Sequence, residues 1–313
     1  MLNITVRRKQ RVCLDLLNTT RAVIGLADVG AGGPLKRPWR LLPASHLSKF
    51  DFEPAGDGAA TPLCVSNRIG RAEFFVARDE RGSSFHRPLS AFAQRFGLSS
   101  HLTARTIEVE CTTLDHYFDG RFESIDALDI NVEGHDYQVL QGGKRLLQEG
   151  VVKLLKVEFE LAEVWEGQGW LSDIDPLMRA QGYVLAAMDL ECARPVSVRS
   201  YYHPGEPLWG KALYVPGRAR WQALLQRFAG DADLLEQAVA KAAALYLAAD
   251  LLGQAFDVLE LGSQVRQLPR LEPARVKQQI ASAYRWARVE SGVRTGRHLM
   301  ERALGLRSGE SEP

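Results

Sequence analysis

Short apolar runs bounded by turn-forming residues recur along the first 216 residues of the chain. Runs of this length, rich in strand-forming residues, are typical of buried strands. Stretches with helical spacing lie between several of them, at 136–150 and at 171–182, where Ser172 is a candidate N-cap. This alternation predicts a mostly parallel sheet. The first helix is expected at 8–17, and the core strands within 22–30, 47–54, 63–67, 127–134 and 154–161.

Two further runs, 72–79 and 106–114, alternate apolar and polar residues and follow the run at 63–67. Because no helical stretch separates them from that run, we expect an inserted antiparallel pair. Runs at 183–191 and 208–216 then close the sheet. The first 216 residues are therefore predicted to form one α/β domain.

The pattern changes after Pro216, where strand-forming residues become rare and alanine and leucine recur at helical spacing. Residues 217–307 are predicted to form a C-terminal α-helical extension, and 308–313 a disordered tail. The extension has two apolar stripes, formed by Leu235, Val239, Ala242 and Tyr246 and by Leu252, Phe256 and Leu259.

Composition narrows the class of protein. The 313 residues are 46% hydrophobic and 25% charged, which is ordinary for a globular protein. A net charge of +1 gives no overall attraction to nucleic acid or membranes, and no apolar stretch approaches the length of a membrane span. The cysteines are far apart and form no CxxC pair, so we expect reduced thiols and a cytoplasmic location. They are Cys13, Cys64, Cys111 and Cys192.

Candidate chemistry begins with the glycines that follow the first predicted strand, in "ADVGAGG". Gly30 and Gly32 match the start of the Gly-x-Gly-x-x-Gly pattern that cradles a dinucleotide pyrophosphate, but Leu35 occupies the position of the third glycine. This difference counts against a nicotinamide cofactor. Glu53 ends the second predicted strand, where an acid accepts hydrogen bonds from ribose hydroxyls in nucleotide-binding sheets.

Six segments strengthen this interpretation by their order along the chain: "ADVGAGG", "FDFEP", "TIEVECTTLDHYF", "IDALDINVEGHDYQVLQGG", "LLKVEFE" and "WGKALYVP". On this ordered set, residues 20–216 resemble the FkbM-type family of S-adenosylmethionine-dependent methyltransferases. The resemblance implies a Rossmann-like class I methyltransferase fold, with a mostly parallel seven-stranded sheet, an antiparallel last strand and an inserted β-hairpin. It also implies S-adenosyl-L-methionine as the cofactor, bound by Asp28, Gly30, Ala31, Gly32 and Glu53, with Asn67 near the adenine.

The segment "DINVEG" departs from the Lys-Ile-Asp-Val-Glu-Gly that is usual in the family. Asn131 stands at the customary acid and Asp129 at the customary lysine, which leaves the general base open. Because side chains alternate along a strand, Asp129, Asn131 and Glu133 are expected on one face, with Asp129 as an acid that has a structural partner. The candidate catalytic residues are Glu133, Asn131, Glu158 and His135, with Glu160 on the same strand face as Glu158.

Two of these candidates have alternative interpretations. Glu133 is equally suited to stabilise the start of the following helix. His135 is alternatively an exposed histidine at that helix start. The segment "RGSSFHRP" supplies candidate substrate residues, Ser83, Ser84 and His86, although its composition is also that of a polar turn. His203 and Trp209 precede the last strand, where aromatic faces can stack on a sugar or pack in the core.

The leading hypothesis is an S-adenosylmethionine-dependent O-methyltransferase, and the family resemblance points to a sugar hydroxyl in a polysaccharide, glycolipid or glycosylated natural product as acceptor. The alternatives are a non-catalytic binding module that keeps the cofactor fold, and a nicotinamide-dependent dehydrogenase. We expect no metal ion, because no ligand-spaced motif is present, and no nucleic acid partner. Residues 264–307 hold ten Lys or Arg against three Glu, which suggests contact of the C-terminal helices with an anionic partner. The oligomeric state is not predicted.

Overall fold

The computed structural model describes residues 4–54, 61–198 and 205–284. Its central sheet has six strands in the order β2-β1-β6-β7-β9-β8. The strands β1, β2, β6 and β7 are parallel, whereas β9 pairs antiparallel with both β7 and β8. These strands are β1 (Ile24–Val29), β2 (Leu47–Phe52), β6 (Ala127–Ile130), β7 (Leu154–Glu160), β8 (Tyr183–Ala193) and β9 (Glu206–Pro216). The predicted parallel sheet with an antiparallel last strand is confirmed.

A second, three-stranded sheet contains the predicted insertion. Its order is β3-β5-β4, and β4 pairs antiparallel with β5 as expected. The strands are β3 (Cys64–Val65), β4 (Gly70–Ala77) and β5 (Thr103–Thr112). Among the described residues the central sheet thus has six strands and not seven, because the run at 63–67 pairs with β5 and not with β2.

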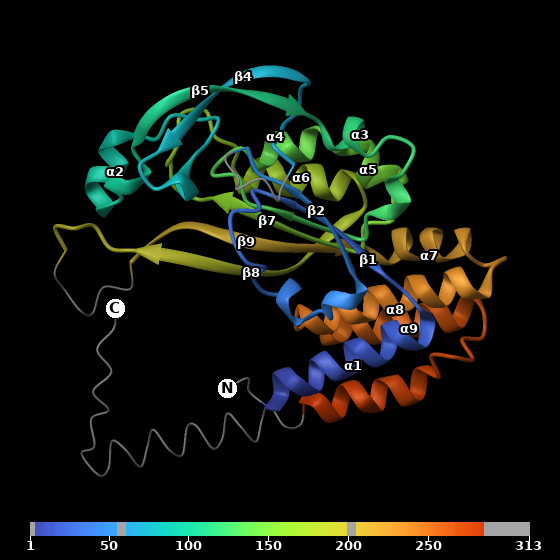
Figure 1. The fold of residues 1–313 in the computed structure, drawn as a ribbon. Helices are drawn as coiled ribbons and strands as arrows, with labels where there is room; N and C mark the ends of the chain where they lie inside the picture. The colour runs from blue at the N-terminus through green and yellow to red at the C-terminus, as the bar shows by residue number, and fades with distance from the viewer. Residues whose placement is uncertain (1–3, 55–60, 199–204, 285–313) are drawn as a thin grey trace, which may run out of the picture.

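Helices cover both faces of the central sheet, as Figure 1 shows. One face carries α4 (Asp136–Gln141), α5 (Lys144–Glu149) and α6 (Leu171–Ala180), and the other carries α1 (Ile4–Thr20), α8 (Ala232–Ala248) and α9 (Leu252–Val265). The remaining helices are α2 (Ser90–Phe96), α3 (Leu114–Tyr117), α7 (Arg218–Arg227) and the segment 273–284. Short 3-10 turns are η1 (Trp39–Leu41), η2 (Ala44–His46), η3 (Glu80–Gly82), η4 (Ser99–His101) and η5 (Phe122–Ser124).

Strand alternation sends neighbouring side chains of β1 into different cores. Ile24 and Leu26 pack with α1, α7, α8 and α9, while Ala27 and Val29 pack with the helices of the other face. The predicted α6 begins after Trp170, whose backbone N–H donates to Asp173. The expectation of Ser172 as N-cap is wrong, because Ser172 lies inside the first turn of that helix.

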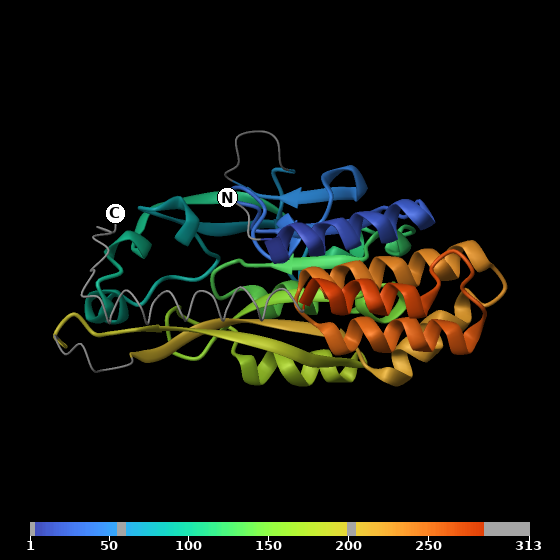
Figure 2. The ribbon, with the colours of Figure 1, turned by 90° about the horizontal axis from the view of Figure 1, so that it is seen from below.

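The segment predicted as a helical extension forms a layer of this fold in its described part. The stripe of Leu235, Val239, Ala242 and Tyr246 is fully buried and packs in the same core as α1 and β1. Figure 2 shows α1 beside α8 and α9. The expected disordered tail at 308–313 lies outside the described residues.

Candidate active site

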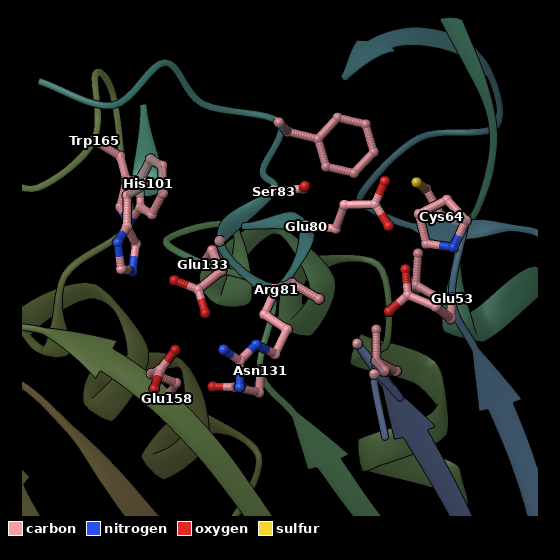
Figure 3. A pocket seen from close by; sticks show the side chains of 18 of the residues that line it. Glu53, Cys64, Glu80, Arg81, Ser83, His101, Asn131, Glu133, Glu158 and Trp165 are labelled. Carbon is pink, nitrogen blue, oxygen red and sulfur yellow. The ribbon is translucent and has the colours of Figure 1, made fainter. Parts of the chain in front are cut away.

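A cavity of about 330 Å³ lies at the carboxyl ends of β1, β2, β6 and β7. Ligand crevices in parallel sheets form at this edge. The second sheet and η3 line the opposite wall. In Figure 3, Glu53 and Cys64 lie on one side and Glu133, Glu158, His101 and Trp165 on the other, with Asn131 between them. We call these the glycine side (Gly30, Gly32, Glu53, Cys64) and the acid side (Glu133, Glu158, Glu160, Trp165, Lys211).

The turn after β1 requires glycine for a close approach. Gly30 has a φ of 85°, and a Cβ at this position would lie 2.1 Å from the backbone oxygen of Asn131. The N–H of Gly30 donates to the carbonyl of Phe52 at 3.0 Å, which ties the turn to the end of β2. A Cβ on Gly32 would lie 3.6 Å from Glu53 Oε2, so the Glu53 carboxylate faces the turn.

The residues of the glycine side fit a nucleoside cofactor. Gly30 and Gly32 leave the turn free of side chains, and the predicted ribose acid, Glu53, stands beside Gly32 in the same cavity. Leu63 and Val65 add an apolar wall next to them, suited to a planar base. The structure thus brings together three of the predicted cofactor residues: Gly30, Gly32 and Glu53.

Asp28 does not line the cavity with them. It pairs across the sheet with Asp51 of β2 and Asp129 of β6. Burial, and then the two neighbouring acids, raise the pKa of Asp28 to about 7. Asp129 has the structural partners that were expected for it: it accepts a hydrogen bond from Trp39 Nε1 at 2.6 Å and one from Lys156 at 3.0 Å.

The expected common face is confirmed for Asp129 and Asn131. Asp129 pairs with Lys156 and Asn131 with Glu158, and these two partners lie on one face of β7. Because β6 ends at Ile130, Glu133 reaches the cavity from the turn that follows and not by strand alternation.

Ala31 and Asn67 also lie outside the cavity lining. The backbone N–H of Ala31 donates to Phe52 at 3.2 Å, so this residue shapes the turn. The side-chain nitrogen of Asn67 donates to Gln141 at the end of α4, at 2.9 Å. The structure therefore does not bring Asn67 into the cavity lining with Gly30, Gly32 and Glu53, whereas Cys64 belongs to it.

Glu158, on the acid side, is oriented by two neighbours. The amide nitrogen of Asn131 faces it and donates to Oε1 at 2.9 Å and to Oε2 at 2.5 Å, since an oxygen there would meet only acceptors. Lys211 Nζ lies 3.7 Å from Oε1, because the register of β9 on β7 sets these residues opposite each other. Burial raises the pKa of Glu158 to about 7, although Lys211 lowers it. A carboxyl group that titrates near neutrality suits proton transfer at pH 7.

Glu133 lies in a turn with a strained backbone. Its φ is 54°, and Gly134 follows with a φ of 84°. A Cβ on Gly134 would lie 2.5 Å from Trp165 Cδ1, so the turn packs directly on the indole. Burial, and then the Glu158 carboxylate, raise the pKa of Glu133 well above its ordinary value.

Glu160 lines the cavity beside Glu158, as strand alternation predicted. It is 3% exposed, and its Oε2 has no hydrogen-bond partner in the described part of the chain. Burial, followed by Glu158, raises the pKa of Glu160 well above the ordinary value, while a hydrogen bond from Trp165 lowers it. A buried carboxylate without a partner is costly, so Glu160 favours its neutral form until a donor or a cation arrives.

His135 and His86 belong to a hydrogen-bonded chain next to the cavity. His86 Nδ1 lies 2.9 Å from the carbonyl oxygen of Glu166, His86 Nε2 lies 3.0 Å from His135 Nδ1, and His135 Nε2 lies 2.9 Å from Ser66 Oγ. Burial lowers the pKa of His86, and it lowers the pKa of His135 to about 3, so both rings are neutral. Because neutral rings have one donor each and a carbonyl only accepts, His86 donates from Nδ1, His135 donates to His86, and Ser66 donates to His135.

This chain changes the roles available to the predicted residues. His135 is buried, not exposed, and does not line the cavity. Ser84 Oγ donates to the backbone oxygen of Glu133 at 2.6 Å. Ser84 and His86 thus hold the loop at 83–86 against the Glu133 turn. Of the three predicted substrate residues, Ser83 alone is among the described residues that line the cavity.

Several cavity residues were not predicted from the sequence. Trp165 and His101 face each other with ring centroids 6.3 Å apart. The position of Lys211 in the cavity depends on the register of β9, and a single sequence does not reveal a strand register. Lys36 reaches the cavity from a loop and Arg81 from η3. Of the aromatic candidates, Trp209 lines the cavity, and His203 lies outside the described residues.

No group of three or more His, Cys, Asp or Glu side chains among the described residues could hold a metal ion. Within the same part of the chain, every helix is too short or too polar to cross a membrane.

Known proteins were compared by sequence and by structure. Residues 42–185 match the family model of the methyltransferase FkbM domain. No curated protein matches the sequence. Among solved structures, one similar chain is magnesium protoporphyrin IX methyltransferase from Synechocystis PCC 6803, with bound S-adenosylmethionine. It is 14% identical over 69% of this chain and 86% of that chain, with a TM-score of 0.30, which is too low to bear on the site.

The match runs from the end of η1 through β7 and α6 to the start of β8, and it includes most of the residues that line the cavity. The glycine turn after β1 precedes the matched segment, and Glu191, Trp209 and Lys211 follow it. FkbM methyltransferases depend on S-adenosylmethionine, and the glycine side has the turn and the acid that such a cofactor needs. The family resemblance predicted from the sequence is confirmed over residues 42–185, which match the methyltransferase FkbM domain.

Proposed function

We propose that this methyltransferase moves a methyl group to a hydroxyl of a saccharide, with Glu158 as the general base. The observation that carries the proposal is the placement of Glu158. Its carboxyl group, with a pKa of about 7, is held by Asn131 and Lys211 in the same cavity as the glycine turn and Glu53.

The glycine side would hold the cofactor, with Glu53 accepting hydrogen bonds from the ribose. S-adenosylmethionine supplies an electrophilic methyl group on a sulfonium sulfur. The acid side would orient the acceptor hydroxyl in line with that methyl carbon, and such positioning contributes much of the rate. Glu158 takes the hydroxyl proton as the new O–C bond forms and the C–S bond breaks.

Asn131 has a defined part in this arrangement. An aspartate at position 131 would add a second carboxylate beside Glu158, whereas the amide donates to it. Asn131 therefore orients the base and favours its ionised form. Trp165, His101 and Trp209 offer aromatic faces on which a sugar ring can stack.

Calorimetry with S-adenosylhomocysteine, followed by turnover of S-adenosylmethionine with a panel of saccharides, tests the proposal. We expect binding and an O-methylated sugar. Glu158→Gln should retain S-adenosylhomocysteine binding and lose turnover, whereas the exposed Glu163→Gln serves as a matched control with native turnover. Binding without product for every acceptor would favour a non-catalytic module. Equal turnover by native protein and Glu158→Gln would remove Glu158 from its role.

A further inference from the structure

Carboxyl groups outnumber cationic side chains on the acid side of the cavity. Glu133, Glu158 and Glu160 line it together, and Lys211 is the nearest cation among the described residues that line this side. Lys211 is itself shared, with its Nζ 3.7 Å from Glu158 and 3.3 Å from Glu191. One shared ammonium group does not balance these carboxylates.

The cations elsewhere in the cavity do not correct this imbalance. Arg81 is paired with Asp79 at 2.7 Å on the exposed lip. Lys36, in the loop after β1, lowers the pKa of Glu133 and of Glu158, but less than Lys211 does. Among the described residues that line the cavity, seven carboxylate side chains accompany three cationic ones. These are Glu53, Asp79, Glu80, Glu133, Glu158, Glu160 and Glu191, with Lys36, Arg81 and Lys211.

Glu160 gives an independent sign that a ligand belongs here. Its side chain is almost fully buried and lines the cavity, yet Oε2 has no partner among the described residues. Trp165, which hydrogen-bonds to the same side chain, also lines the cavity with its ring. An ammonium group in this part of the cavity can gain a hydrogen bond from the free Glu160 oxygen and a cation–π contact from the Trp165 ring.

We propose that the acceptor is an amino sugar, whose protonated amine binds Glu160 and the face of Trp165 while a neighbouring hydroxyl meets Glu158. This inference rests on the proposed function and adds the chemical class of the acceptor. The amine is a recognition group and stays protonated. The methyl group goes to oxygen, and the hydroxyl proton goes to Glu158.

Titration of the full-length protein with glucosamine, glucose and N-acetylglucosamine at pH 7, with and without saturating S-adenosylhomocysteine, tests this. Glucosamine carries a largely protonated amine at this pH. Glucose lacks the amine, and in N-acetylglucosamine the acetylated nitrogen is uncharged. We expect glucosamine to bind at least tenfold more tightly than either neutral sugar. Glu160→Gln keeps the size of the side chain and should reduce this preference to less than threefold. Glu163→Gln is the exposed control and should retain it.

The outcomes separate this inference from the proposed function. If S-adenosylhomocysteine does not bind, the proposed function fails. If it binds while glucosamine shows no preference, or none of the sugars binds, the amino-sugar inference alone is overturned. Weaker binding of S-adenosylmethionine to Glu160→Gln would also overturn it, because the acid side would then serve the positive charges of the cofactor. An N-methylated product would also overturn the amino-sugar inference, since the amine would then be the reacting group and not a recognition group.

Discussion

At Glu158, burial and charge act against each other. Burial raises its pKa, Lys211 lowers it and Glu191 raises it again, with a net value of about 7. The carboxylate form is the base, so the active fraction of the enzyme grows as the pH rises through 7. Neutral pH is the range in which such a group is both available and able to accept a proton.

A pH–rate profile of kcat should therefore rise between about pH 6 and 8 and then level off. Glu158→Gln should reduce kcat by a factor of about 10²–10⁴ and abolish this rise. Glu163→Gln provides the reference profile for an exposed acid. If kcat of Glu158→Gln rises in the same way near pH 7, the titrating group is not Glu158.

The ionisation of Glu160 should also change how the free energy of unfolding depends on pH. Its pKa is raised above the ordinary 4.5, so the folded state binds more protons than the unfolded state above that pH. Its contribution to stability is complete below about pH 4.5 and is lost as the pH rises through the folded-state pKa. Between pH 5 and 8, native protein should lose more than about 1 kcal/mol relative to Glu160→Gln. Denaturant unfolding of both proteins at pH 5 and pH 8 measures this difference. If the free energy of unfolding changes equally with pH in native protein and Glu160→Gln, the prediction is contradicted.

The main constraint at the level of elements is the turn between β6 and α4. It combines two residues with positive φ, contact with Trp165 and the hydrogen bond from Ser84. This turn sets where the Glu133 side chain enters the cavity. The positive φ and the close packing leave little room for substitution at Gly134.

Gly134→Ala should lower stability by about 1–3 kcal/mol, because alanine disfavours this φ and its Cβ meets Trp165. Turnover should fall with it, since Glu133 and Trp165 shift together. Gly253→Ala is the matched control: Gly253 is exposed and helical, and a Cβ there has no neighbour within 4 Å. That variant should gain about 0.5–1 kcal/mol. Thermal unfolding of both variants measures this difference in stability. Equal changes in melting temperature would show that a Cβ at Gly134 is tolerated and that the turn does not require glycine.

The order of the elements was predictable because strands and helices have different periods. The sequence therefore indicated the parallel strands, the inserted pair and the cluster of Gly30, Gly32 and Glu53 at one sheet edge. Register was not predictable: nothing in a single sequence shows that Lys211 pairs opposite Glu158. Loop residues were harder still, because Asn67 and His86 are fixed by tertiary partners, Gln141 and the His135 chain.

At the scale of the whole molecule, α8 is joined to the sheet by a buried ion cluster. Asp126 accepts hydrogen bonds from Lys153 at 2.6 Å and from Lys241 of α8 at 2.9 Å, and from the backbone of Gly25. Both Asp126 and Lys153 are buried. Helical composition predicted α8 from the sequence, but its place against β1 depends on contacts between distant residues.

Asp126→Asn should therefore destabilise the protein by about 3–5 kcal/mol, because it leaves Lys153 buried without its counter-charge. Glu123→Gln, which breaks the exposed pair with Arg227, should cost at most about 1 kcal/mol. Denaturant unfolding gives both values. Similar small losses for the two variants would mean that the cluster contributes little to the attachment of α8.

The most direct test of the account is a crystal structure with S-adenosylhomocysteine. We predict density along the glycine side, with the ribose hydroxyls on the Glu53 carboxylate and the sulfur directed toward Asn131 and Glu158. Density outside this cavity, or a Glu53 side chain turned away from the ribose, would contradict the account.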